Sequence, residues 1–237
     1  MTQQTEALKK LFGELYAKLM GFTLEQEFLQ DLGESLEVFY NLHEGDEYEF
    51  VPTEEFMFLT WFLLDDTTPD GYSLMDEFFK RNADELSLTE TQICKALKET
   101  NLSLYQVKNV VPGESMTLRD VFTGETLLTP ETTGSDDLAI DTLLFTRVLK
   151  LGETSFLVGA GIFLDAVVTE PITKYITDQF QECCESGNHM SFKDFLKGNG
   201  EMINWWIRAY ESGEFSSDEE DENDDDRNDG DDKEDKE

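Results

Sequence analysis

The sequence predicts an α+β protein with an N-terminal helical bundle, a small antiparallel β-sheet or barrel, C-terminal helices and a disordered acidic tail. Apolar residues recur at helical spacing through the first hundred residues, and the period shortens to about two from Asn101. Helical spacing returns after Glu170 and Pro171. The expected regions are residues 1–100, 101–166, 167–214 and 215–237.

The first region is expected to hold five helices. Thr23 with Gln26 predicts a capping box for the second helix, and Ser87 with Glu90 predicts one for the fifth. Residues 56–64 are apolar on nearly every side, which is typical of a helix buried all round. We therefore expect the other helices to pack around this central one.

Five strands are expected over residues 104–111, 116–122, 126–132, 143–150 and 156–164. Gly159 and Gly161 resemble a nucleotide-binding loop, but a third glycine, a lysine and a following helix start are missing. A strand with a bulge or tight packing is the better interpretation. The last helix is expected from Ser191 to Tyr210.

The charge is extreme, with 53 acidic and 18 basic residues and a formal net charge of −35. The last 20 residues carry −11 of this, so residues 1–217 still carry −24. Such a field repels phosphates and attracts basic protein surfaces. We therefore expect no direct nucleic-acid binding and predict a basic protein partner, although acidity also serves solubility.

The cysteines indicate a reducing compartment. Cys94, Cys183 and Cys184 are an odd number and include an adjacent pair, which is a poor disulfide framework. The first residues lack the basic and apolar segments of a secretion signal. The longest apolar run is too short to span a bilayer. We therefore expect a cytoplasmic protein without membrane attachment, of unknown oligomeric state.

Residues 66–77 have the spacing of a helix–loop–helix calcium loop. Oxygen donors are expected from Asp66, Thr68, Asp70, the backbone carbonyl of Tyr72, and Glu77. The pattern departs from the standard loop because Thr stands at the third position, Pro at the fourth and Ser at the eighth. A turn followed by a serine-capped helix explains the same residues without metal. Calcium is therefore one of two open interpretations.

Other chemical patterns are weak. Cys183, Cys184 and His189 lie close together, but adjacent cysteines do not match the usual zinc spacing and no fourth ligand is evident. No nucleophile motif accompanies the two histidines. With 53 acidic residues, carboxylate pairs cannot be singled out. Whether the protein is an enzyme stays uncertain, and the sequence favours a non-enzyme.

The C-terminal part carries the candidate partner-binding residues. Trp205, Trp206 and Tyr210 are aromatic residues of the kind that dominate binding hot spots, although helical spacing favours a core position for at least one tryptophan. The acidic tail is like-charged and low in complexity, so we expect disorder. It is a second candidate surface, beginning with Asp218, Glu219, Glu220 and Asp221.

Several segments resemble uncharacterised bacterial cytoplasmic proteins. They include residues 58–65, 86–90, 105–107, 118–125 and 141–149. Many of those proteins carry a zinc motif of the SecA C-terminal type. The resemblance implies no known reaction, and the cysteine motif is missing from the end of this chain. Zinc binding is therefore not carried over.

The sequence is best interpreted as a non-catalytic acidic interaction or regulatory protein that engages a basic protein partner. One alternative is a protein that responds to calcium or another cation through residues 66–77. Another is an enzyme with a carboxylate site that the sequence does not reveal.

Overall fold

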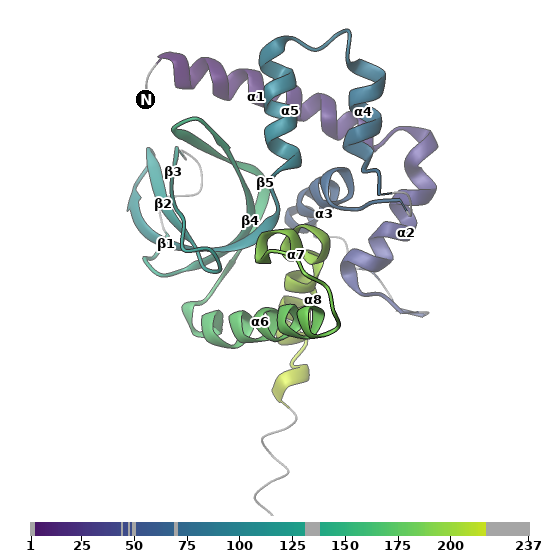
Figure 1. The fold of residues 1–237 in the computed structure, drawn as a ribbon. Coiled ribbons are helices and arrows are strands. Elements are labelled where there is room, and N and C mark those ends of the chain that lie inside the picture. Colours follow the sequence, from purple (N-terminus) through teal and green to yellow (C-terminus); the bar gives the residue numbers. More distant parts are fainter. Residues whose placement is uncertain are drawn as a thin grey trace, which may run out of the picture.

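The computed structural model describes residues 3–43, 45–46, 48, 51–68, 71–130 and 138–216. The predicted α+β fold is confirmed, with helices before and after an antiparallel sheet (Figure 1). The acidic tail, including Asp218, Glu219, Glu220 and Asp221, lies outside the described residues, as does Asp70.

Along the sequence, the helices fall into two groups, one before the five strands and one after them. The first group is α1 (Gln3–Thr23), α2 (Leu29–Tyr40), α3 (Pro52–Leu64), α4 (Leu74–Asn82) and α5 (Leu88–Lys98). The second group is α6 (Thr169–Glu185), α7 (Phe192–Asn199) and α8 (Glu201–Glu211). Three short 3-10 turns accompany them: Gln26–Phe28, Ala166–Val168 and Glu214–Ser216.

The helix-start predictions met different outcomes. The capping box of Ser87 and Glu90 is confirmed at α5. The predicted box of Thr23 and Gln26 is wrong, because α1 continues through Thr23, whose hydroxyl donates to the Met20 carbonyl at 2.7 Å. The 3-10 turn Gln26–Phe28 separates Thr23 from α2, whose N-cap residue is Phe28 with no side-chain capping hydrogen bond.

The last predicted helix is two helices rather than one. The break lies at Gly200, between α7 and α8. A Cβ on Gly200 would stand 3.0 Å from the Leu196 carbonyl oxygen and 3.1 Å from Cβ of Leu102 on the neighbouring strand. The chain therefore turns where only a glycine lets the helix junction approach the sheet this closely.

The sheet has five antiparallel strands in the order β3-β2-β1-β4-β5. Its strands are β1 (Leu102–Val111), β2 (Ser115–Asp120), β3 (Thr126–Pro130), β4 (Leu143–Leu151) and β5 (Thr154–Leu164). The sheet curls so far that β3 and β5, at its two edges, contact each other (Figure 1). The described residues of these two strands form no hydrogen-bonded ladder, so the barrel is open along this seam.

Alternating side chains of the curled sheet belong to two cores. Tyr105 and Val107 of β1 lie in a small core inside the curl, with side chains from β2, β3 and β4. Leu102 and Leu104 lie in the large core that the sheet shares with the helices. The period of two therefore divides β1 between the two cores.

Gly159 and Gly161 lie within β5, which confirms the prediction of a tightly packed strand. Gly159 has a φ of +79°, and the pairing of β4 with β5 shifts register beside it. A Cβ on Gly161 would stand 2.6 Å from Cδ1 of Leu144. The two glycines therefore serve close packing in the strand.

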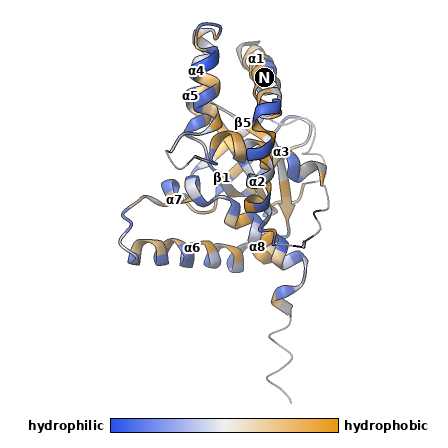
Figure 2. Cartoon of the chain, turned by 90° about the vertical axis from the view of Figure 1, so that its right-hand side faces the viewer, coloured by the Kyte–Doolittle hydropathy of each residue, from blue (hydrophilic) through white to orange (hydrophobic). Residues whose placement is uncertain are grey.

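Helix α3 is buried along residues 57–64, as predicted, although its Phe56 is 44% exposed. It contacts α1, α2, α4 and β5, and in Figure 1 it lies between α4 and α5 on one side and α7 and α8 on the other. Peripheral α6 lies along the lower edge of the molecule in Figure 2, and it buries Ile172 and Ile176 in the large core. Burial of the α3 side chains holds the helices and the sheet in one core.

Candidate functional site

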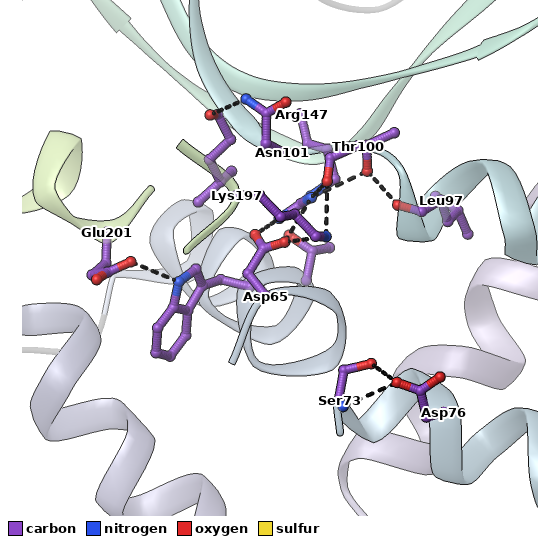
Figure 3. A network of polar contacts seen from close by, with 12 residues as sticks. Asp65, Ser73, Asp76, Leu97, Thr100, Asn101, Arg147, Lys197 and Glu201 are labelled. Atoms are coloured by element: carbon purple, nitrogen blue, oxygen red, sulfur yellow. Dashed lines mark hydrogen bonds and ion pairs between the residues drawn. The ribbon is translucent and has the colours of Figure 1, made fainter. Parts of the chain in front are cut away.

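The C-terminal end of α3 is fixed by a buried ionic network (Figure 3). The Asp65 carboxylate accepts hydrogen bonds from both terminal nitrogens of Arg147 and from Nζ of Lys197, the latter at 2.5 Å. Arg147 and Lys197 also donate to the Thr100 carbonyl, each at 2.9 Å. The side chains of Asp65 and Arg147 are fully buried. This network ties α3 to β4 and α7.

A second buried carboxylate lies nearby on α8. Trp61 of α3 donates its indole N–H to Glu201 at 3.0 Å. Burial is the main cause that raises the pKa of Glu201 to about 7; the hydrogen bonds that its carboxylate accepts oppose the rise, and the charges of Asp65 and Asp66 add to it. Glu201 is therefore a group that titrates near neutral pH.

Asp66, the next residue after Asp65, lines a cleft between α2 and α4. Its carboxylate accepts a hydrogen bond from the Ser35 hydroxyl at 2.5 Å. Burial raises the pKa of Asp66, and the charges of Asp31 and Asp65 act in the same direction, while the Ser35 and Thr67 hydrogen bonds oppose them. A cation beside Asp66 would favour its ionised form.

The cleft has a volume of about 960 Å³. This lies at the upper end of the ~300–1,000 Å³ range of ligand pockets. Its apolar lining comes from Phe28, Val38, Phe62 and Leu74, and its charged lining from Asp31, Glu34, Asp66, Asp76, Glu77 and Lys80. The cleft therefore combines an apolar floor with an acidic rim.

The acids of the cleft differ in their partners. Asp76 pairs with Lys98 and caps α4 through Ser73, and Glu77 pairs with Arg81 and with Lys80. By contrast, Asp31, Glu34 and Asp66 make no ion pair with any cation in the described part of the chain. The unpaired negative charge of the cleft therefore lies on α2, which forms one wall, and just after the C-terminal end of α3.

Four of the predicted calcium-loop residues are described and line this cleft: Asp66, Thr68 and Tyr72 precede α4, and Glu77 lies on it. The Tyr72 carbonyl accepts from the Thr68 N–H at 3.0 Å, and the Glu77 carboxylate accepts from Arg81 Nε at 2.8 Å. The Thr68 hydroxyl in turn accepts from the Tyr72 N–H at 3.3 Å. Three of the predicted oxygen donors are thus already hydrogen-bonded within the chain, and calcium binding stays an alternative prediction.

Among the described residues, no group of three or more His, Cys, Asp or Glu side chains is arranged to hold a metal. Cys183 and Cys184 are partly exposed free thiols on α6. His189 is exposed on the connection to α7.

The aromatic residues of α8 have separate roles. Trp206 is buried and stacks with Tyr210 and with Phe215, whose ring centroids lie 5.2 and 5.4 Å away. Trp205 donates its indole N–H to the Val38 carbonyl at 2.9 Å, so it ties α8 to the α2 wall of the cleft. Tyr210 is 45% exposed and is the predicted aromatic residue most available to a partner.

The sequence pattern pointed to one wall of the cleft and not to the other. The missed wall is the stripe of α2 that carries Asp31, Glu34, Ser35 and Val38. The sequence did contain a sign of this wall, because these residues recur at helical spacing and combine two acids with an apolar residue on one side of the helix. Val38 is 50% exposed, which an apolar position on a core-facing stripe would not be.

Fold and site together define an α+β protein in which an open five-stranded barrel shares its core with helices, and in which an acid-rimmed cleft opens between two of those helices. The chain belongs to the family of unknown function DUF7986, whose sequence model matches residues 3–196. Comparisons with curated proteins and with solved structures found no significant match. In the described residues, no helix is long and apolar enough to cross a membrane.

Proposed function

We propose that the protein is a non-catalytic interaction protein that engages a basic protein partner. The observation that carries the proposal is the set of cleft carboxylates, Asp31, Glu34 and Asp66, that lack a cationic partner within the described chain. A partner's lysine or arginine would supply the missing charge, and the net charge of −35 would speed the encounter.

We also place the protein in the cytoplasm. All three cysteines, Cys94, Cys183 and Cys184, are free thiols, which fits a reducing compartment. The resemblance to cytoplasmic bacterial proteins points the same way and stays a prediction.

The test is capture of partners by the immobilised full chain from a cell lysate at low and at high salt. Basic proteins should be retained at low salt and lost at high salt, because exposed charges more than about 10 Å apart are screened at 0.1 M ionic strength. A chain truncated after Phe215 separates the contribution of the acidic tail from that of the folded part. Partners that are retained equally at both salt concentrations would contradict the electrostatic mechanism.

A further inference from the structure

We infer that the cleft between α2 and α4 is the surface on which the basic partner docks, and that the docking segment carries an apolar anchor flanked by lysine or arginine. This inference rests on the proposed function and names its surface and the chemistry of its ligand. The occupant is a segment of another protein, because the tail of this chain has the same sign of charge as the cleft.

The floor of the cleft calls for an apolar side chain. Val38 is 50% exposed in the cleft lining and supplies apolar surface that a ligand can cover, whereas Phe28 and Phe62 are buried and expose only 9% and 5% of theirs. An inserted apolar side chain would remove this surface from water, which favours binding in proportion to the area covered. A uniformly charged segment would leave the apolar lining of the cleft hydrated and would not gain this hydrophobic free energy of binding.

The acidic residues of the cleft favour a ligand that has lysine or arginine on both sides of the apolar anchor. Asp31 and Glu34 are exposed and one helical turn apart on α2. Asp66 lies on the facing wall, where it accepts from Ser35 of α2 at 2.5 Å. Because none of the three is paired with a described cation, an incoming lysine or arginine need not displace one.

The cleft is held in shape before anything binds. Trp205 fixes the end of α2 through the Val38 carbonyl, and Asp65 fixes the start of the loop wall through Arg147 and Lys197. A pre-organised surface loses little conformational freedom on binding, which leaves more of the contact energy for affinity.

The test uses two labelled peptides and fluorescence anisotropy with the full-length protein. The first peptide is lysine-rich with leucine anchors, and the second has serine in place of each leucine at the same charge. We expect the leucine peptide to bind about tenfold more tightly. The preference should persist in a chain truncated after Phe215.

Two variants in the cleft and one control variant locate the contact, with a fourth substitution in reserve. Asp31→Lys reverses an exposed charge in the cleft and should weaken binding of the leucine peptide about tenfold at low salt. Glu114→Lys makes the same charge change at the exposed β1–β2 turn, away from the cleft, and should change affinity only slightly. Val38→Ser should reduce the leucine preference and leave binding of the serine peptide unchanged. Glu34→Lys replaces Asp31→Lys if circular dichroism shows that the latter is unfolded.

The possible results separate the two claims. Equal binding of both peptides, with equal effects of Asp31→Lys and Glu114→Lys, would overturn the docking inference and leave a diffuse electrostatic interaction. Absence of binding by either peptide at low salt would overturn the docking inference and count against the proposed function as well.

Discussion

Replacing Glu201 by glutamine should stabilise the protein at neutral and alkaline pH. Glu201 is 7% exposed and accepts one hydrogen bond from Trp61 at 3.0 Å. Glutamine has nearly the same shape and its amide oxygen can accept the same bond. The substitution therefore removes a buried negative charge while it keeps the contact.

The magnitude follows from the pKa. Burial raises the pKa of Glu201 from 4.5 to about 7 in the folded protein. A shift of one pKa unit corresponds to about 1.4 kcal/mol, so the ionised carboxylate costs the fold about 3 kcal/mol. The folded state binds the proton more tightly than the unfolded state. The stabilising contribution of the protonated group is therefore complete below about pH 4.5 and is lost as the pH rises through about 7.

The assay is urea unfolding of wild type and Glu201→Gln between about pH 4.5 and about pH 8, a range that brackets both pKa values. The stability difference should be near zero at the acid end and should approach 3 kcal/mol in favour of Glu201→Gln at the alkaline end. Glu182→Gln, at an exposed position of α6, is the matched control and should show no such trend. A difference that does not vary with pH, or a glutamine variant less stable than wild type at pH 8, would refute the reasoning.

Three further predictions test the fold and the loop. Asp65→Asn leaves the buried Arg147 without its carboxylate and should lower the free energy of unfolding by about 3–5 kcal/mol, measured by urea unfolding; a loss below about 1 kcal/mol would mean that the pair is not buried as described. Gly161→Ala places a methyl group against Leu144 and should cost about 1–3 kcal/mol in thermal unfolding, whereas an unchanged melting temperature would show that β4 and β5 can separate there. Calorimetric titration with Ca²⁺ tests the cation alternative, for which we expect no saturable heat because Glu77 is already paired; a saturable site that Asp66→Asn removes would contradict us.

The fold could be predicted largely because its signals are local. The period of two from Asn101 and the capping box at Ser87 each depend on residues within one element. The break at Gly200 was missed because it depends on contact with Leu102, which lies far away in the sequence. Closure of the barrel stayed open for the same reason, since it depends on contact between β3 and β5.

The candidate site could be predicted only where it is contiguous in sequence. Asp66 and Tyr72 lie on one loop and were found together, while Asp31 on α2 was not connected with them. Asp65 and Asp66 are adjacent and chemically alike, yet one pairs with Arg147 in the core and the other lines the cleft. Only tertiary contacts distinguish two such neighbours.

Hydrogen–deuterium exchange of the full chain, alone and with the lysine-rich leucine peptide, tests the central claim most directly. We expect slower exchange on binding in residues 28–38 and 66–80, with little change in the barrel strands. Protection confined to the barrel or to α6, with none in those two segments, would contradict it.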